Sequence, residues 1–335
     1  MKILLYFENE KLIKTSGIGR AMKHQMAALE SAGIEYSIDP DCEDFDILHV
    51  NTYGPASSML ISKAKKMGKK VIVHAHSTEE DFRNSFVMSN QIAPIVKKRL
   101  VSIYSEGDYI ITPTPYSKQI LEGYGISVPI EALSNGIDMH RFGYNEEKVK
   151  AFRRYFSLKE DEKVVISVGL YFDRKGLLDF VEVAKRLPQY RFIWFGYTPL
   201  YSIPKKIREV VNEDHPSNVY FPGYVKGAII EGAYQGCDAF FFASKEETEG
   251  IVVLEALAAG ADIIVRDIPV FDPWLVNGKN CYKGKTVDEF VQLVEACVEN
   301  ILPSTSKEGI KTAENRSIEE VGKQLKRIYE KVLKM

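Results

Sequence analysis

The sequence predicts an α/β protein made of two successive halves, each a doubly wound parallel sheet covered by helices on both faces. Short, strongly apolar runs alternate with segments long enough for helices, which is the pattern of buried parallel strands joined by crossover helices. The alternation occurs twice, with a polar stretch between the two series. The length of 335 residues also exceeds the ~250 residues at which single hydrophobic cores stop growing. We therefore expect two domains.

The first series begins at the start of the chain. Helical patterns run from about Gly19 to Ala32, up to Met67, and from about Ile92 to Ser105. The apolar runs that alternate with these helices read as strands: KILLYF, DILHV, VIVHAH and YIITP. Each strand is separated from the next by a helix-length connection, so we expect the strands to be parallel.

The second series follows the polar segment RFGYNEEKVKAFRRYF. Its strand-like runs are VVISVG, RFIWFG, NVYFPG, AFFFA and DIIVRD. We place one domain at residues 1–156 and the other at residues 157–316. A last amphipathic helix, within residues 317–335, has apolar positions at helical spacing and can dock on either domain, including back on the first.

Composition narrows the class of protein. A formal net charge of −2 gives no general attraction to nucleic acid, so we expect no nucleic-acid partner. The segment MKILLYFENE turns acidic after a short apolar run, which is typical of a first strand and not of a signal peptide, and no apolar run is long enough to span a bilayer. The four cysteines lack metal-ligand spacing, so we expect reduced thiols, no zinc site and a cytoplasmic protein.

The most informative stretch is a loop that leads from the strand AFFFA into a helix, SKEETEG followed by IVVLEALAAG. Gly250 permits a tight turn, and the unpaired N–H groups of Gly250, Ile251 and Val252 would then suit a phosphate or diphosphate. Glu247 and Glu255 bracket this anion site, at most roughly 12 Å apart along a helix. Acidic residues before a helix are also ordinary partners of its dipole, but Glu255 lies among apolar neighbours and needs a partner for its charge.

Two other loops lie at strand ends. Gly17 and Gly19 follow the first strand, but the third glycine of the dinucleotide fingerprint is absent, which argues against a nicotinamide dehydrogenase. Arg174 and Lys175 precede a helix, where cations are disfavoured unless an anion binds between them, although a solvated basic loop is the alternative.

The strand VIVHAH ends in two histidines on one face. We interpret His76, at the carboxyl end, as a hydrogen-bond donor to substrate and His74 as a core histidine whose polar atoms are satisfied. No third metal ligand accompanies the pair at a recognisable spacing.

The strings ETEGIVVLEALAAG, VGLYFDRKG and SNGID closely resemble the retaining glycosyltransferases of family 4, over nearly the whole chain. The resemblance implies the GT-B fold, in which two Rossmann-like domains face each other across a cleft, and a nucleotide-sugar donor without a metal cofactor. It also implies that Glu247 faces the donor sugar, Glu255 holds the ribose and Lys175 binds the diphosphate. His76 matches the acceptor-side histidine.

The resemblance further places Gly17 and Gly19 near the diphosphate. The family usually has an arginine at the position of Leu170, and Arg174 is the substitute we expect to bind the donor. The same resemblance assigns residues 1–156 to the acceptor and membrane, and residues 157–316 to the nucleotide sugar.

The strings VNTYGP, HSTEEDF and NSF in the first half resemble the glycolipid synthases of Gram-positive bacteria. The implied reaction moves glucose or galactose from a UDP-sugar to glucosyldiacylglycerol. The alternatives are diacylglycerol itself, a soluble or polysaccharide acceptor, and a sugar-nucleotide-binding protein that catalyses no transfer.

An anionic membrane is the expected further partner, because basic and apolar residues alternate near Ile92–Val101. The residues that we assign to acceptor and membrane are Phe82, Phe86, Lys97, Lys98 and Arg99, with Val87 and Met88 beside Phe86 and several lysines of residues 63–70 upstream. A solvated helical face and core packing of the aromatic residues are the alternatives. The expected location is the inner face of the cell membrane.

Overall fold

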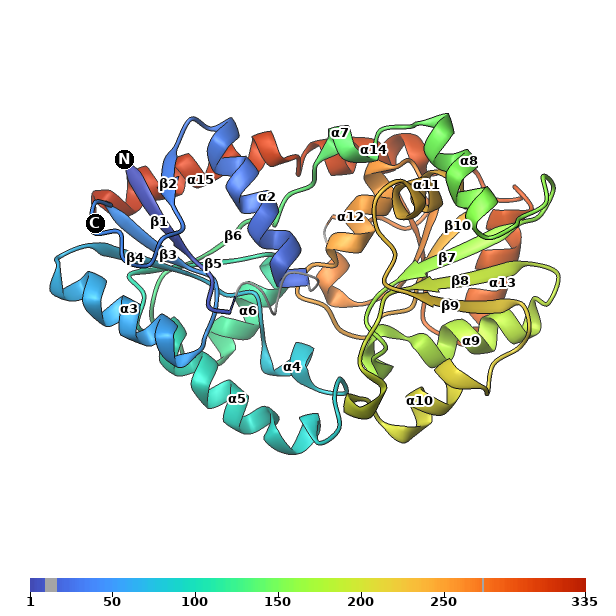
Figure 1. Cartoon of the computed structure of the whole chain (residues 1–335), viewed down its shortest axis with the longest axis horizontal. Helices are drawn as coiled ribbons and strands as arrows, with labels where there is room; N and C mark the ends of the chain where they lie inside the picture. The colour runs from blue at the N-terminus through green and yellow to red at the C-terminus, as the bar shows by residue number, and fades with distance from the viewer. Residues whose placement is uncertain (10–16, 273) are drawn as a thin grey trace. The chain divides into compact units, whose positions relative to one another are not determined.

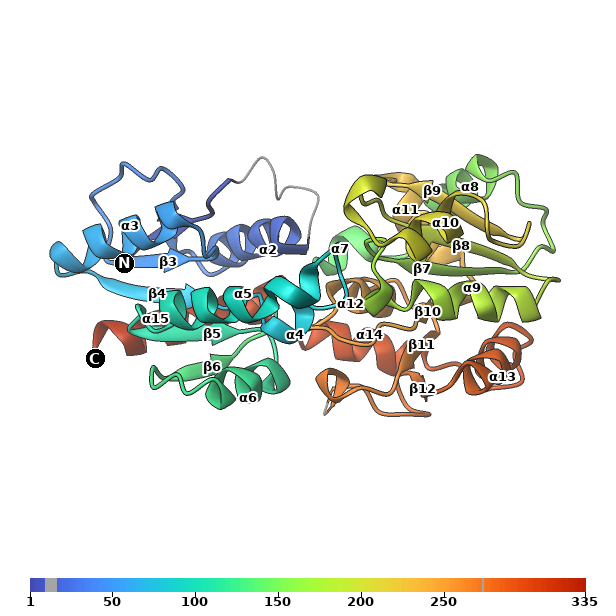
Figure 2. The same cartoon turned by 90° about the horizontal axis from the view of Figure 1, so that it is seen from below.

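The computed structural model describes residues 1–9, 17–272 and 274–335, which form two compact units. Unit 1 comprises Met1–Phe82, Gln91–Asp138 and Arg316–Met335, whereas unit 2 comprises Arg83–Asn90 and Met139–Asn315. Each unit is a parallel six-stranded sheet with helices on both faces (Figure 1 and Figure 2). The predicted α/β class with two doubly wound sheets is confirmed.

The sheet of unit 1 has the strand order β2-β1-β3-β4-β5-β6. Its strands are β1 (Lys2–Tyr6), β2 (Glu35–Ser37), β3 (Ile47–Val50), β4 (Lys70–His74), β5 (Tyr109–Thr112) and β6 (Ile130–Ala132). The helices of this part of the chain are α2 (Gly17–Ser31), α3 (Pro55–Lys66), α4 (Glu79–Phe82), α5 (Ser89–Tyr104), α6 (Pro115–Gly123) and α15 (Ile318–Leu333).

Alternation along the strands of unit 1 builds a hydrophobic core on each face of the sheet. Ile3 and Leu5 of β1 belong to the core that includes residues of α2 and α15, and Leu4 belongs to the core on the side of α3, α5 and α6. All three side chains are fully buried. Both faces of a parallel strand are covered in this way, which explains why the central strands are mostly apolar.

The sheet of unit 2 has the strand order β12-β11-β10-β7-β8-β9. Its strands are β7 (Val164–Val168), β8 (Arg191–Phe195), β9 (Val219–Gly223), β10 (Ala239–Phe242), β11 (Ile263–Arg266) and β12 (Tyr282–Gly284). Its α-helices are α7 (Met139–Phe142), α8 (Glu146–Tyr155), α9 (Leu177–Arg186), α10 (Lys205–Asn212), α11 (Ala228–Gly236), α12 (Ile251–Ala258), α13 (Val287–Val298) and α14 (Ser306–Glu314). Three 3-10 helices complete the unit: η1 (Asp173–Lys175), η2 (Leu200–Ser202) and η3 (Pro269–Phe271).

The two units divide the chain after Asp138, earlier than the expected boundary at residue 156. The reason is that α7 and α8 are tied to α11 by ion pairs of Glu231 with Arg141 at 2.7 Å and Lys148 at 2.9 Å. The C-terminal helix α15 belongs to unit 1, which is one of the two positions that the sequence left open.

Within the described residues, no helix has both the length and the hydropathy needed to cross a membrane. The four cysteines are free thiols.

Candidate active site

The site in unit 2 is built where the strand order of its sheet reverses. Strands β7 and β10 are parallel neighbours, although the chain makes β8 and β9 between them. The loops that follow them therefore leave the sheet side by side at its carboxyl edge, where open α/β sheets bind ligands. Backbone hydrogen bonding joins the loops, since the N–H of Lys245 donates to the carbonyl of Arg174 at 2.6 Å.

Gly176 allows the first loop to approach the second so closely. Its φ of +77° lies in the left-handed region, and a Cβ at this position would meet the carbonyl oxygen of Ala243 at 2.2 Å. No other residue type fits there without moving the end of β10. The glycine thus places η1, with Lys175, against the loop that carries Glu247.

Lys175 and Glu247, which the sequence identifies as donor-binding and catalytic, form an ion pair in unit 2. The distance between Lys175 Nζ and Glu247 Oε1 is 2.5 Å, and both side chains are largely buried. Ser244 Oγ also donates a hydrogen bond to Glu247 Oε1 at 2.6 Å. The Glu247 carboxylate is therefore held by two donors, one from each of the two loops.

Arg174 differs from its expected role as a donor-binding cation. Its side chain is buried, Nε donates to Ser85 Oγ at 2.8 Å, and Nη1 donates to the carbonyl of Glu246 at 3.2 Å. The guanidinium group thus binds protein acceptors and clamps three segments of unit 2 together. Leu170, at the position where the family has an arginine, packs against the core of unit 2.

Helix α12 begins where the sequence predicts. Gly250 is its N-cap with a φ of +89°, and no side chain caps the helix. The N–H groups at the start of an α-helix have no partner within it, so those of Gly250, Ile251 and Val252 stay the predicted backbone donors to an anion. A residue with a Cβ would be strained in this left-handed conformation. Glycine at position 250 therefore allows the chain to turn from the loop into α12.

Glu255 is buried within α12, and Oε2 accepts a hydrogen bond from the hydroxyl of Tyr234 on α11 at 2.7 Å. The sequence shows that this carboxylate needs a partner but does not identify one. In the structure, the hydroxyl of Tyr234 is one of the hydrogen-bond donors that stabilise this carboxylate.

His76 lies in unit 1, directly after β4, and is neutral. Its Nε2 is 2.9 Å from Asn51 Oδ1, and because an amide oxygen only accepts, Nε2 carries the proton. Burial lowers the pKa of His76 to about 3, and a hydrogen bond with Asn135 opposes this shift less strongly. The ring N–H that we expected to donate to substrate is thus used on Asn51, and Nδ1 can only accept a hydrogen bond.

His74 is not the satisfied core histidine that the sequence predicts. It stacks on His76 with 4.0 Å between ring centroids and on His49 with 5.4 Å. Both of its ring nitrogens are buried without a hydrogen-bond partner. Burial holds the pKa of His74 well below its usual value and lowers the pKa of His49 to about 3.

Gly17 and Gly19 form the first turn of α2 in unit 1, whereas Ser16 of the predicted glycine-rich loop lies outside the described residues. At Gly17, no atom of the described residues lies within 4 Å of the position that a Cβ would take. The close approach of a ligand to this turn stays a prediction.

The residues expected at the acceptor and membrane are used in different ways. Arg99 donates to the carbonyl groups of Tyr53 and Gly54 and to Ser58 Oγ, so it joins α5 to the start of α3. Lys97 pairs with Glu79 at 3.3 Å within unit 1. The remaining three residues differ in place: Lys98 is exposed on α5, Phe82 ends α4 in unit 1, and Phe86 belongs to unit 2.

Sequence reasoning missed four residues that support the site. Asn51 directly follows β3 and Ser244 lies two residues after β10, and a polar residue at the end of a buried strand is a signal that can be read from the sequence. Tyr234 is 21 residues from Glu255, and Ser85 is 89 residues from Arg174. No sequence pattern connects the two members of either pair. Groups of three or more His, Cys, Asp or Glu side chains able to hold a metal ion do not occur in the described part of the chain.

Comparison with known proteins defines the class of this fold and site. Residues 148–316 match the family described as glycosyl transferases group 1, and residues 16–141 match glycosyltransferase family 4. The chain belongs to the group 1 glycosyltransferases and is a glycosyltransferase of the GT-B fold.

The particular relatives are glycolipid enzymes. The chain is 46% identical to the processive diacylglycerol alpha-glucosyltransferase of Acholeplasma laidlawii, over 100% of this chain and 99% of the relative. It is 30% identical to the alpha-monoglucosyldiacylglycerol synthase of the same organism, over 70% of this chain and 62% of the relative. The alpha-galactosylglucosyldiacylglycerol synthase of Streptococcus pneumoniae is 25% identical, over 75% of this chain and 66% of that protein.

Among solved structures, Anabaena HepE in complex with UDP-glucose has a TM-score of 0.79 and 15% identity, covering 99% of this chain and 100% of HepE. The sucrose-phosphate synthase of Thermosynechococcus elongatus has a TM-score of 0.80 and 15% identity, covering 99% of each chain. At this identity the likeness establishes the shared fold.

Proposed function

We propose that the protein moves a hexose from a UDP-sugar to glucosyldiacylglycerol, with retention of the anomeric configuration, and that the hexose is glucose. The observation that carries the proposal is the 46% identity over the whole chain to a processive diacylglycerol alpha-glucosyltransferase. A processive enzyme uses its own product as the next acceptor, so diacylglycerol itself is a second acceptor for the same site.

The Lys175–Glu247 pair supports a specific chemical sequence. In the structure the charges of Lys175 and Glu247 neutralise each other across 2.5 Å. A bound diphosphate competes for Lys175, which releases the Glu247 carboxylate to face the sugar. Cleavage of the bond from the anomeric carbon to the diphosphate then builds negative charge near Lys175 and the start of α12, while Glu247 stabilises the positive charge that develops on the sugar.

The acceptor hydroxyl attacks the anomeric carbon as the bond to the diphosphate breaks. We propose that its proton passes to an oxygen of the departing diphosphate. His76 has a pKa of about 3, which is too low for an efficient base near neutral pH, so we assign it to orienting the acceptor through Nδ1. Lys175 and the helix N–H groups supply the positive charge in this scheme, and we propose that no metal ion is needed.

An exposed apolar and basic surface on unit 1 supports the proposal of a lipid acceptor. Ile92 and Ile95 on α5 are 39% and 69% exposed, and Met59 on α3 is 74% exposed. Arg99 holds these two helices together at Ser58, the residue before Met59. Exposed apolar residues beside cations are typical of a surface that binds an anionic bilayer.

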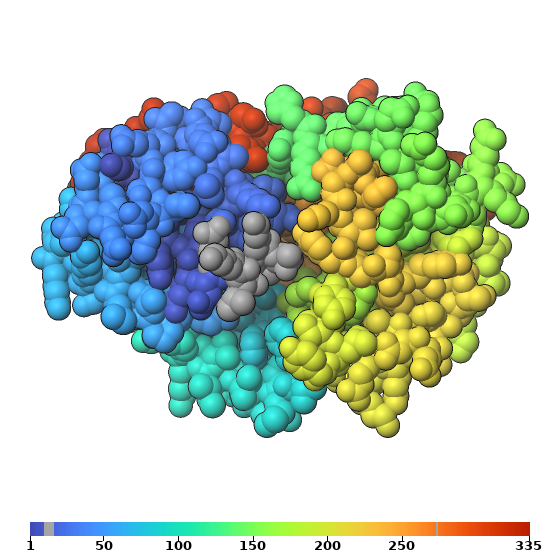
Figure 3. All heavy atoms as spheres, in the orientation of Figure 1, coloured from blue at the N-terminus to red at the C-terminus, as the bar shows by residue number. Residues whose placement is uncertain are grey.

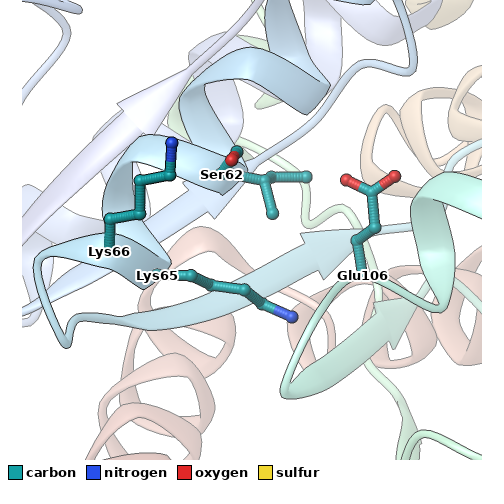
Figure 4. Close-up of a pocket in the computed structure, with 5 residues that line it drawn as sticks. Ser62, Lys65, Lys66 and Glu106 are labelled. Carbon is teal, nitrogen blue, oxygen red and sulfur yellow. The ribbon is translucent and has the colours of Figure 1, made fainter.

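Lysines of α3 extend this surface. Lys65 and Lys66 line an open groove of about 470 Å³ together with Ile61, Ser62 and Glu106. Figure 4 shows the two lysines extending from α3 in different directions, with Glu106 on the opposite side of the groove. We propose peripheral binding to the inner face of the cell membrane through this surface.

The reaction is tested by incubating the purified protein with radiolabelled UDP-glucose or UDP-galactose and, separately, diacylglycerol, glucosyldiacylglycerol and octyl glucoside. We expect an α-linked diglucosyl lipid, identified by NMR of the isolated product, and activity in the presence of EDTA. Transfer to the soluble acceptor alone would refute the lipid assignment.

The membrane surface is tested by cosedimentation with anionic vesicles at low and high salt. Ile95→Asp is expected to weaken binding, because it places a carboxylate in the apolar surface. Ile301→Asp is the matched control, since Ile301 is 72% exposed but lies between α13 and α14 in unit 2. Equal binding by the two variants would remove this surface from the proposal.

A further inference from the structure

The segment Arg83–Asn90 belongs to unit 2, although the chain on both sides of it belongs to unit 1. Two contacts to Arg174 anchor its first part: Arg174 Nε donates to Ser85 Oγ at 2.8 Å, and the Arg174 N–H donates to the carbonyl of Asn84 at 3.2 Å. The segment is therefore attached to the loop that carries Lys175.

Two further contacts hold the middle of the segment. The ring of Phe86 packs edge-on against Phe172, with 4.7 Å between centroids. The N–H of Val87 donates to the carbonyl of Ser202 in η2 at 3.0 Å. The segment thus lies beside the turn that contains Tyr201.

This arrangement exposes apolar side chains. Phe86 is 39% exposed, Val87 52%, Met88 62% and Tyr201 84%. We call these four residues the tip patch. Met88 also has a φ of +63°, a conformation that is uncommon for a residue with a Cβ, so its backbone is strained while its side chain remains in solvent. The N–H of Ser89 donates to the carbonyl of Phe86 at 3.0 Å, so Met88 stands at the tip of a tight turn.

The charge next to the patch is positive. Lys205 and Lys206 begin α10, three residues after Ser202, and both are exposed. Lys205 pairs with Glu209 at 3.4 Å, a pair exposed enough to be weak. The yellow-green atoms of the segment that contains η2 lie at the surface on the face shown in Figure 3.

We propose that the tip patch enters the headgroup region of an anionic bilayer, so that unit 2 has a lipid contact of its own. The inference rests on the proposed function, because a lipid acceptor requires the enzyme to work at a membrane. Valine, methionine and phenylalanine supply apolar area, tyrosine is a residue of the membrane–water interface, and the two lysines attract anionic headgroups. A symmetric contact between two copies would instead bring the same lysines together.

The consequence for the reaction is a link between lipid binding and the donor loop. Because Ser85 and Asn84 bind Arg174, the residue before Lys175, the segment that contacts lipid also supports the loop that holds the diphosphate-binding lysine. Bilayer contact and donor binding would then stabilise the same conformation.

The test uses tryptophan fluorescence in the full chain. Both native tryptophans are buried, at 0% for Trp194 and 6% for Trp274, so an added tryptophan reports its own surroundings. Met88→Trp is compared with Tyr144→Trp, because Tyr144 is 75% exposed in unit 2 and lies between α7 and α8, outside the tip patch. Each variant is mixed with phosphatidylglycerol vesicles with and without brominated acyl chains.

We expect brominated vesicles to quench Met88→Trp but not Tyr144→Trp. Replacing Lys205 and Lys206 by glutamine should weaken vesicle binding about fivefold for each lysine at low salt. If the wild-type chain cosediments with the vesicles and Met88→Trp is not quenched, the tip patch does not meet lipid and the inference is wrong.

Transfer by the wild-type chain to glucosyldiacylglycerol in detergent micelles tests the proposed function separately. Activity in micelles without quenching overturns the tip patch alone. Quenching without transfer to either lipid acceptor supports the membrane contact and overturns the assigned reaction. A chain that does not bind vesicles at all also overturns the inference.

Discussion

Replacing Lys175 by methionine is the sharpest test of the site, because Lys175 pairs with Glu247 in the fold and, in our proposal, binds the diphosphate during catalysis. In the free protein it pairs with Glu247, and the two side chains are only 14% and 6% exposed. Removal of one member of a buried ion pair typically costs about 3–5 kcal/mol, because the other charge stays buried. Since Ser244 still donates to Glu247, we expect a loss near the lower limit, about 3 kcal/mol, in the free energy of unfolding.

The double variant Lys175→Met/Glu247→Gln separates folding from catalysis. It removes both charges, and the glutamine oxygen still accepts from Ser244. We expect the free energy of unfolding to return to within about 1 kcal/mol of the wild-type value. Hexose transfer should not return, because the group that stabilises the leaving diphosphate and the carboxylate that faces the sugar are both absent.

The expected loss in catalysis follows from the role of Lys175 at the leaving group. Removing one preorganised group that stabilises developing charge lowers kcat by about 10²–10³-fold. Urea unfolding monitored by circular dichroism measures stability, and a coupled assay of UDP release measures transfer. Lys245→Met is the control, since Lys245 pairs with Asp173 at 3.1 Å in the same pair of loops but is 41% exposed. That variant should change both quantities little.

Two results would refute this reasoning. Unchanged kcat/KM in Lys175→Met would show that the lysine does not stabilise the leaving group. Recovery of transfer in the double variant would show that the single variants fail because of an unpaired buried charge, and that neither side chain acts in the reaction.

Three further outcomes are expected. Because burial lowers the pKa of His74, the unfolded state binds more protons than the folded state below about pH 6.5, so the free energy of unfolding decreases as the pH is lowered, by up to about 1.4 kcal/mol per pH unit for this residue. His74→Phe should therefore give a flatter pH profile in urea unfolding, and an unchanged slope would contradict this reasoning. Gly250→Ala should destabilise by about 1 kcal/mol and weaken UDP binding in calorimetry, whereas Gly260→Ala, at the other end of α12 with a φ of +75°, should cost similar stability without the loss of UDP affinity. Arg99→Gln should lower the free energy of unfolding by about 1–3 kcal/mol but leave vesicle binding unchanged, because the Arg99 guanidinium group binds backbone carbonyls. Loss of vesicle binding without loss of stability would instead show that Arg99 contacts the membrane.

The sequence by itself determined the parts of this protein that depend on local pattern. Strands buried on both faces are mostly apolar, so the two series of strands can be predicted from the sequence. The start of α12 could be predicted because left-handed backbone favours glycine, and Gly250 stands between a strand and a helical pattern. The resemblance of the loop motifs to family 4 then predicts the roles of Lys175 and Glu247.

Only the tertiary structure decided how the charged and polar groups are paired. Arg174 and Lys175 are adjacent in the chain, yet their partners differ. Arg174 donates a hydrogen bond to Ser85, 89 residues away, whereas Lys175 forms an ion pair with Glu247. Hydrogen bonds and ion pairs act over about 3 Å, and the sequence does not record which distant groups the fold brings within that distance. The same limit applies to the unpartnered ring of His74 and to the unit in which Phe86 lies. Pattern specifies the elements, and packing selects their partners.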